Sequence, residues 1–258
     1  MPNTPRTSSA TEAPLICEEN GELSLHFNFP TIQSRMLKSD PTRLILDYTR
    51  TMMGFLLLLA NPERIAMIGL GGGSLAKYCS NKLPETDFTS IEVSADVIAL
   101  RNDFGIPPDN SKFRIICADG AEFVRRETGV YDVLLVDGFD HSGQPEQLCS
   151  SFFYDNCYTS LRPRGILVVN LCADDPLLEN YLSRLDVSFD GQLVLAEADE
   201  GENMIVFACK GISFPPKLSE ITERLRLLEL QHPVDLDKTA QKIVGRSLKR
   251  NRSPKKRR

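Results

Sequence analysis

The sequence predicts an α/β protein with a doubly wound, mostly parallel seven-stranded sheet of the Rossmann type, preceded by a small N-terminal β-hairpin domain. Three observations predict this class. From Arg64 onward, short apolar runs alternate with amphipathic stretches, as in repeated βα units. A glycine cluster follows the first apolar run directly. Acidic residues stand at the ends of later runs, where ligands bind in such sheets.

The composition is that of a soluble globular protein, with 258 residues, 41% hydrophobic and 25% charged. The longest apolar stretch, residues 52–60, is too short to span a bilayer. The N-terminus lacks the apolar core of a secretory signal, and the seven cysteines show no C-x-x-C spacing. These features predict a cytoplasmic protein without membrane contact. Three histidines, none near a cysteine pair, favour a site without metal.

The charge is distributed unevenly along the chain. The net charge is −5, yet residues 246–258 contain eight Lys or Arg residues and no acid. The rest of the chain therefore carries 22 basic residues against 35 acidic ones. An acidic body favours cationic substrates. The basic tail indicates either a solvated, disordered end or a weak contact with polyanions such as RNA.

The first quarter of the chain predicts a small domain. Residues 1–14, rich in Thr, Ser and Pro, predict a disordered N-terminus. Loose alternation around Asn20-Gly21 predicts a β-hairpin over residues 15–28. Apolar residues at helical spacing over 41–59, with Asp40 as N-cap and Pro41 behind it, predict a linking helix. We therefore expect a small β domain with its linking helix over 15–60, a nucleoside-binding catalytic domain over 61–245 and a basic disordered tail over 246–258.

The catalytic domain is expected to alternate strands and helices. Ser74 and Ser94 are candidate N-caps for the first two helices. Strands are expected at 65–68, 87–93, 112–117, 132–136 and 165–171, with helices at 74–83, 95–104, 120–127, 151–161 and 176–185. An antiparallel pair at 192–197 and 203–209 closes the sheet, and a last amphipathic helix covers 218–230.

The glycine cluster and the next strand together predict a nucleoside-containing ligand. A strand, a glycine turn and a helix start let backbone amides point at a ligand, because glycine has no Cβ in the way. A tight turn alone is the other explanation of the cluster Gly69, Gly71, Gly72 and Gly73. Glu92, however, follows Gly69 by 23 residues, close to the spacing at which an acid reaches a ribose hydroxyl.

Two more acids follow later strands. Asp119 and Asp137 end the third and fourth predicted strands. With the glycine loop and Glu92 they come from four successive strands, so they are expected to surround one crevice. Each has a simpler explanation as a helix cap or a solvated turn residue, and a lone loop histidine such as His141 is most often only solvated.

These motifs resemble the spermidine synthase family of aminopropyltransferases. The resemblance is carried by the glycine loop, Glu92, the turn Ala118-Asp119-Gly120, and the segment Val-Asp-Gly-Phe-Asp-His-Ser-Gly over residues 136–143. Phe153-Tyr154 and the run over 161–169 fit the family's following helix and fifth strand. It extends over about residues 20–210 and implies the class I S-adenosylmethionine-dependent methyltransferase fold.

The resemblance also implies roles for the site residues. Gln33 matches the family's glutamine near the end of the β domain, at the nucleoside site. The glycine loop, with Gly69, Gly71, Gly72 and Gly73, would hold the methionine-derived end of the donor, Glu92 its ribose, and Asp119 with Gly120 its adenine. Asp137 would take the proton from the attacking amine, and Asp140 would help to hold that amine. The co-substrate would be decarboxylated S-adenosylmethionine or S-adenosylmethionine itself, with a small-molecule amine as acceptor and no metal.

Departures from the family pattern keep alternatives open. Aminopropyltransferases usually carry an aspartate in the glycine loop that binds the donor's primary amine, and here Gly72 takes its place. The family's Tyr-His-Glu is Tyr48-Thr49-Arg50. The main expectation is transfer of an aminopropyl group from the decarboxylated donor to a polyamine-type amine. The alternatives are a methyltransferase of the spermidine-synthase-like branch and a catalytically silent nucleoside-binding homologue. Whether the chain forms a homodimer stays open.

Overall fold

The computed structural model describes residues 14–27, 31–140, 143–211 and 214–250, with side chains as far as residue 245. The N-terminal segment 1–13, His141 and Ser142, and the last eight residues lie outside these ranges. In the described part of the chain, no helix combines the length and apolar character needed to cross a membrane.

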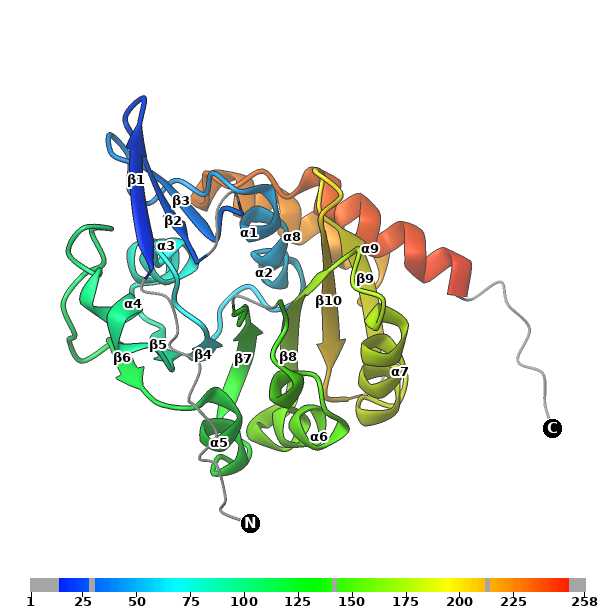
Figure 1. Cartoon of the computed structure of the whole chain (residues 1–258). Helices are drawn as coiled ribbons and strands as arrows, with labels where there is room; N and C mark the ends of the chain where they lie inside the picture. The colour runs from blue at the N-terminus through cyan, green and yellow to red at the C-terminus, as the bar shows by residue number, and fades with distance from the viewer. Residues whose placement is uncertain (1–13, 28–30, 141–142, 212–213, 251–258) are drawn as a thin grey trace, which may run out of the picture.

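The larger body is a seven-stranded sheet (Figure 1). Its strand order is β6-β5-β4-β7-β8-β10-β9, with neighbours parallel from β6 to β8 and β10 antiparallel to both of its neighbours. The predicted mostly parallel sheet is therefore confirmed. The strands are β4 (Arg64–Ile68), β5 (Asp87–Glu92), β6 (Phe113–Cys117), β7 (Tyr131–Val136), β8 (Leu161–Cys172), β9 (Leu193–Glu197) and β10 (Asn203–Cys209).

Helices cover both faces of the sheet, because consecutive strand residues point to opposite sides. In β4, Ile65 and Met67 join one apolar core, whereas Ala66 and Ile68 join the other. The second core is covered by α5 (Gly120–Arg125), α6 (Ser151–Ser160) and α7 (Leu178–Ser188) (Figure 1). The first is covered by α1 (Asp47–Met52), α2 (Phe55–Leu58), α3 (Ser74–Lys82), α4 (Ala95–Ala99), α8 (Leu218–Gln231) and α9 (Asp237–Arg250).

The topology fixes where a ligand can bind. Strand β4 lies between β5 and β7, so the strand order reverses beside it. At such a point the connections leave in opposite directions and open a crevice beyond the carboxyl ends of the strands. The glycine loop after β4 and the segment after β7 therefore lie side by side at this crevice.

The N-terminal part of the described chain forms a three-stranded antiparallel sheet rather than the expected hairpin. Strands β1 (Leu15–Glu19) and β2 (Glu22–His26) meet at Asn20 and Gly21, whose φ angles of +52° and +79° suit the predicted hairpin turn. A third strand, β3 (Ser34–Leu37), pairs with β2. A strand of four residues was too short to predict from the sequence. Its Met36 side chain is buried in the first core together with Leu23 and Leu25.

Several expected helices differ in the structure. The single helix expected over 41–59 is two short ones, and Asp40 bridges back to Leu37 instead of capping a helix. The break falls at Gly54, where a Cβ would lie 2.5 Å from Thr239 Cγ2, so the chain packs there too closely for a side chain. The helix expected over 95–104 ends at Ala99. Gly73, with a φ of +68°, is the N-cap of α3 and Ser74 its first residue, whereas Ser94 caps α4 as predicted.

The C-terminal helix α9 was not expected. It buries Ala240 and Ile243 and extends to Arg250, so it includes the first five residues of the predicted tail. A short helix, η1 (Glu146–Leu148), also interrupts the loop that was expected over 138–150.

Candidate active site

A cavity of about 970 Å³ lies at the carboxyl ends of β4, β5, β7 and β8. The N-terminal sheet and the first turn of α1 form its opposite wall, so it lies between the small sheet and the seven-stranded sheet. Most of the predicted site residues line it, namely Gln33, Gly69, Gly71, Glu92, Gly120, Asp137 and Asp140. Gly72, Gly73 and Asp119 lie next to the cavity without lining it.

The glycine loop is a tight arc held by backbone contacts. Gly69 has a φ of +96°, and a Cβ there would lie 2.2 Å from the carbonyl oxygen of Asp137. The loop after β4 and the segment after β7 therefore touch along their backbones, and only glycine permits this approach. At Gly72 a Cβ would lie 2.8 Å from the Phe104 ring and 2.9 Å from Ser34 Oγ. The space that the family's aspartate would need is thus filled in this chain.

Glu92 holds the glycine loop in place. Its Oε2 accepts a hydrogen bond from the Leu70 amide and its Oε1 from the Ser94 amide, each at 2.9 Å. Burial raises the pKa of this carboxyl above its ordinary value, while the backbone N–H groups oppose the rise. Glu92 also lines the cavity, so its carboxylate fixes the glycine loop at the cavity wall.

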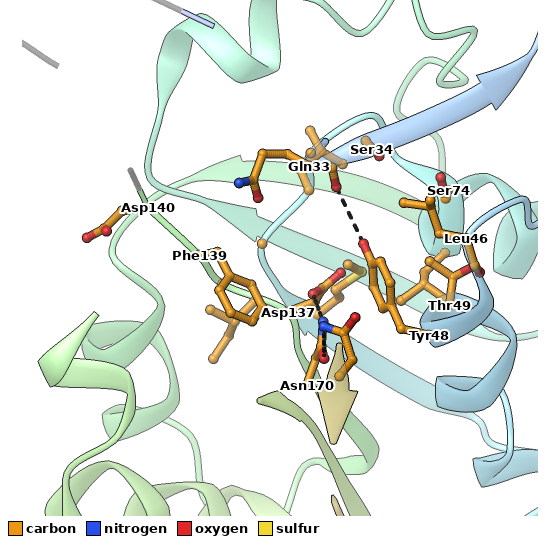
Figure 2. A pocket seen from close by; sticks show the side chains of 18 of the residues that line it. Gln33, Ser34, Leu46, Tyr48, Thr49, Ser74, Asp137, Phe139, Asp140 and Asn170 are labelled. Atoms are coloured by element: carbon orange, nitrogen blue, oxygen red, sulfur yellow. Dashed lines mark hydrogen bonds between the residues drawn. The ribbon is translucent and has the colours of Figure 1, made fainter. Parts of the chain in front are cut away.

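Asp137 begins the segment after β7 and lies deep in the cavity (Figure 2). Its Oδ1 accepts a hydrogen bond of 2.9 Å from Nδ2 of Asn170, which is almost fully buried in β8. Burial raises the pKa of Asp137 to about 6, and the Asn170 amide and the Tyr48 hydroxyl oppose that rise. The side chain is therefore a carboxylate at neutral pH, yet it binds a proton more readily than an ordinary aspartate.

Tyr48 lies between Asp137 and the N-terminal sheet. Its hydroxyl oxygen is 3.5 Å from the backbone carbonyl oxygen of Gln33, and its ring lies beside Asp137 (Figure 2). The single hydrogen of this hydroxyl can be donated to the Gln33 carbonyl or to the Asp137 carboxylate, one at a time. Burial, followed by the charge of Asp137, raises the pKa of Tyr48 well above its ordinary value, so it remains a neutral donor. The first turn of α1 thus reaches across to the end of β7.

Asp140 lies apart from Asp137 on the same segment (Figure 2). Backbone hydrogen bonds of 2.9 and 3.2 Å join Asp140 to Gly143, and both residues line the cavity.

Asp119 caps helix α5, which was the alternative to ligand binding that the sequence left open. Its Oδ1 accepts from the Glu122 amide at 2.9 Å, at the start of α5, and its Oδ2 accepts from Gln147 Nε2 at 3.2 Å. The capped helix begins with Gly120 on the cavity wall, where a Cβ would lie 2.4 Å from Ile68 Cγ2. Capping and contact with an adenine are compatible, and the second stays a prediction.

The outer wall of the cavity is the turn between β9 and β10, residues 198–202. The buried Asp47 accepts a hydrogen bond of 2.7 Å from the Glu200 amide, which ties the turn to α1. On the other side Lys238 and Lys242 of α9 pair with Asp199 at 2.9 and 2.6 Å. The turn places Glu200 and Glu202 on the cavity wall.

The cavity is strongly acidic. Of the charged side chains that the structure places on its wall, Arg35 is basic and six are acidic, namely Asp47, Glu92, Asp137, Asp140, Glu200 and Glu202. Arg35 is itself paired with Glu22, at 3.5 Å. An excess of acids in a low-dielectric cleft attracts cationic ligands and repels anionic ones.

Sequence reasoning missed Asp47, Asn170, Asn203 and the acids of the β9–β10 turn. A signal for Asn170 was present, because it is the polar residue of an otherwise apolar run over 166–171. A buried amide needs hydrogen-bond partners, so such a residue in a strand indicates a polar neighbour beyond the strand. For Asn203 and Asp47 no local signal exists, since each acts on a segment distant in sequence.

A seven-stranded sheet of this order, with a glycine loop after its central strand and acids at the strand ends, is the methyltransferase-like fold. Solved structures share this fold. A probable spermidine synthase from Corynebacterium glutamicum has a TM-score of 0.69 at 19% identity, covering 86% of this chain and 91% of that one. Human methyltransferase-like protein 13 in complex with SAH has a TM-score of 0.66 at 20% identity, covering 72% and 91%.

Sequence comparison narrows the class. The model of the spermine/spermidine synthase domain matches residues 46–194. The polyamine aminopropyltransferase of Chromobacterium violaceum is 38% identical over 194 residues, 75% of this chain and 74% of that protein. The polyamine aminopropyltransferase of Neisseria meningitidis serogroup A is 36% identical over 222 residues, 85% and 84% of the two chains. The chain belongs to the spermine/spermidine synthase family, and the resemblance stated from the motifs is confirmed.

Proposed function

We propose that the chain is an aminopropyltransferase that moves an aminopropyl group from decarboxylated S-adenosylmethionine to a polyamine-type amine. The observation that carries this proposal is Asp137, a carboxylate with a raised pKa at the end of β7, beside the glycine loop in an acidic cavity. Membership of the spermine/spermidine synthase family supports it.

The residues present suit both substrates. The arc of Gly69 and Gly71 leaves room for a nucleoside against the backbone, and Glu92 offers a carboxylate to the ribose hydroxyls. The amine enters past Asp140, Glu200 and Glu202, whose charges attract an ammonium group. The glycine loop and Asp137 then lie together, so the electrophilic carbon and the base face the same amine nitrogen.

Asp137 acts as the general base. It accepts a proton from the amine as the nitrogen forms its bond to the carbon beside the sulfonium. The carbon–sulfur bond breaks, its electron pair stays on sulfur, and methylthioadenosine leaves. Asn170 and Tyr48 hold the carboxylate and support its ionised form during this step. A sulfonium leaving group is already activated, so Asp137 provides the acid–base chemistry that the transfer requires.

Two observations bear on the donor. Gly72 lacks the family's carboxylate, which favours S-adenosylmethionine and hence methyl transfer. The cavity as a whole favours the decarboxylated donor, because its wall carries six acids and a single, already paired arginine, and an excess of negative charge repels the carboxylate of S-adenosylmethionine. Even without an acid at position 72, the cavity wall carries more acidic than basic side chains. Aminopropyl transfer is therefore the function that the site supports best.

The test supplies both donors, separately, with putrescine, spermidine or a cell lysate as acceptor, and follows methylthioadenosine and S-adenosylhomocysteine. Methylthioadenosine released only with the decarboxylated donor supports the proposal. S-adenosylhomocysteine formation would identify a methyltransferase instead. Consumption of neither donor, while methylthioadenosine still binds in calorimetry, would identify the silent homologue.

The nucleoside site yields a prediction at Glu92. Glu92→Ala removes the acceptor of the Leu70 and Ser94 amides and of the ribose hydroxyls, and charged hydrogen bonds of this kind contribute about 1.5–3 kcal/mol. The affinity for methylthioadenosine should therefore fall by about tenfold or more, measured by calorimetry. Glu220→Ala, on the surface of α8, is the matched control and should bind normally. Unchanged affinity in Glu92→Ala would show that the nucleoside binds elsewhere.

The basic tail is proposed to bind polyanions weakly and to be dispensable for turnover. Eight cations lie in residues 246–258, whereas the tie between α9 and the β9–β10 turn is made earlier, by Lys238 and Lys242. Truncation after Gly245 should abolish salt-sensitive retention on an RNA column and preserve turnover. A truncated protein that folds but has lost activity would contradict this division.

A further inference from the structure

Three polar side chains form a line of hydrogen bonds that ends at Asp137. Asn203 Nδ2 donates to Asn170 Oδ1 at 2.9 Å, and Asn170 Nδ2 donates to Asp137 Oδ1 at 2.9 Å. Asn203 is the first residue of β10 and pairs with Cys172, whereas Asn170 pairs with Ile205. The two asparagines are therefore diagonal neighbours on one face of an antiparallel pair, within reach of each other's side chains.

The line has a direction. A primary amide presents two N–H groups on one side and a carbonyl oxygen on the other. An ionised Asp137 offers only acceptors, so the favourable orientation of Asn170 points its N–H group at the carboxylate. Its carbonyl then faces β10, where it needs a donor. The Asn203 amide supplies that donor. Asn170 is only 1% exposed, so an apolar residue at position 203 would leave the buried Asn170 carbonyl without its hydrogen bond from Asn203.

We propose that Asn203 is a positioning residue, which fixes the amide of Asn170 so that an N–H group faces Asp137 and keeps the carboxylate oriented and ionised. Asn203 lines the cavity, but the role assigned to it is exerted through Asn170. The inference deepens the proposed function and rests on Asp137 being the base.

The surroundings of Asp137 show why this donor matters. Burial opposes ionisation of Asp137. The cavity wall also carries the acids Asp47, Glu92, Asp140, Glu200 and Glu202. Arg35 lines the cavity as well, but it pairs with Glu22. Two groups favour the ionised form of Asp137, namely the Asn170 amide and the Tyr48 hydroxyl from α1. The pKa of about 6 therefore depends on a donor that Asn203 holds in place.

The test is the pH dependence of kcat/KM in Asn203→Leu, which removes the amide at similar size. In the wild type, kcat/KM should fall on the acid side of the profile as Asp137 takes up a proton, and this acid limb marks its pKa. In Asn203→Leu the acid limb should move upward by about one pH unit, and activity should recover toward the wild-type plateau at high pH. Asn203→Gln, which retains an amide donor, should leave the limb near its wild-type position. A limb unmoved in Asn203→Leu, or an equal loss of activity at every pH, would overturn the proposal.

A second variant covers the case in which Asn203→Leu does not fold. Asn203→Asp offers acceptors only, so it draws the N–H groups of Asn170 toward itself and turns the Asn170 carbonyl toward Asp137. The upward shift of the acid limb should exceed one pH unit. In an Asn170→Leu background Asn203→Leu should not move the limb further, because the group that transmits the effect is gone. A further shift in that background would overturn the proposal.

One comparison separates this inference from the proposed function. Asp137→Asn should abolish the acid limb in the residual activity, and a limb that persists would show that another group is the base. If the limb disappears in Asp137→Asn but stays in place in Asn203→Leu, the base assignment stands and the role of Asn203 fails.

Discussion

Asp137→Asn is expected to lower turnover by about 10²–10⁴-fold, because asparagine keeps the shape of the side chain but cannot take a proton. The measurement is steady-state release of methylthioadenosine, with donor affinity followed by calorimetry. Donor affinity should stay close to that of the wild type, since the nucleoside contacts lie on the glycine loop and Glu92. Turnover within a few-fold of the wild type would exclude Asp137 as the base.

Asp140→Asn is the matched comparison, because it removes the same charge from the same segment. We expect it to raise the KM of the amine more than it lowers kcat, as befits a residue that holds the acceptor. Equal effects of the two substitutions on kcat would contradict the division of roles between them.

The same Asp137→Asn variant should be more stable than the wild type at neutral pH. The folded-state pKa of about 6 lies above the ordinary 3.8, so the folded protein binds the proton more tightly than the unfolded chain. The free energy of unfolding therefore falls as pH rises from about 4 to 6, by up to about 3 kcal/mol. Asparagine has no proton to lose in this range, so the variant does not show this decrease. Thermal unfolding at pH 7 and pH 4 should show a gain at pH 7 that shrinks at pH 4. A lower Tm at pH 7 would show that ionised Asp137 stabilises the fold.

Gly69→Ala is expected to disrupt the site and the fold together. Its Cβ would lie 2.2 Å from the carbonyl oxygen of Asp137, in a backbone with a φ of +96°. Backbone strain and overpacking each contribute about 1–3 kcal/mol, so the free energy of unfolding should fall by about 2–6 kcal/mol. Urea denaturation at pH 7 measures it, and any folded fraction should bind methylthioadenosine poorly.

Gly71→Ala is the control for Gly69→Ala. It also has a positive φ, +52°, but a Cβ there would lie 3.6 Å from Ser34 Oγ, an ordinary contact. Only the cost of the left-handed conformation remains, about 1–2 kcal/mol. If both variants unfold at the same urea concentration, the contact between Gly69 and Asp137 is not what holds the two segments together.

Local features in the sequence predicted most of the fold. The apolar runs predicted the strands of the large sheet, and Asn20-Gly21 predicted the first hairpin turn. Features set by distant contacts could not be predicted. The break between α1 and α2 depends on Gly54 packing against Thr239 and Phe207, and neither is near it in sequence. Helix α9 has only a narrow apolar stripe, with Ala240 and Ile243 buried, and its many charges conceal it.

The site residues also divide into those that local sequence predicted and those that distant contacts place. Glu92, Asp137 and the glycines stand at strand ends, so the order of strands was enough to predict that they would meet. Asn170 and Asn203 meet only because β10 pairs with β8 in one register, and a shift by one residue would turn Asn203 to the opposite face. Register between strands that are distant in sequence has no local signal. The acids of the β9–β10 turn are held at the cavity by distant partners, Asp47 of α1 and the two lysines of α9 that pair with Asp199.

The tethered turn between β9 and β10 has an evolutionary consequence. The reacting centre is built from backbone contacts between the segments after β4 and β7, whereas the acceptor wall is a short turn attached by Asp47 and by two lysines of α9. The hydrogen bonds that reach Asp137 from this side come through Asn170 and Asn203. Substitutions at Glu200 and Glu202 that leave these two asparagines in place therefore alter the wall without removing those hydrogen bonds. A lineage can therefore exchange one amine for another by changing a handful of residues in this turn, while the transfer chemistry is inherited intact.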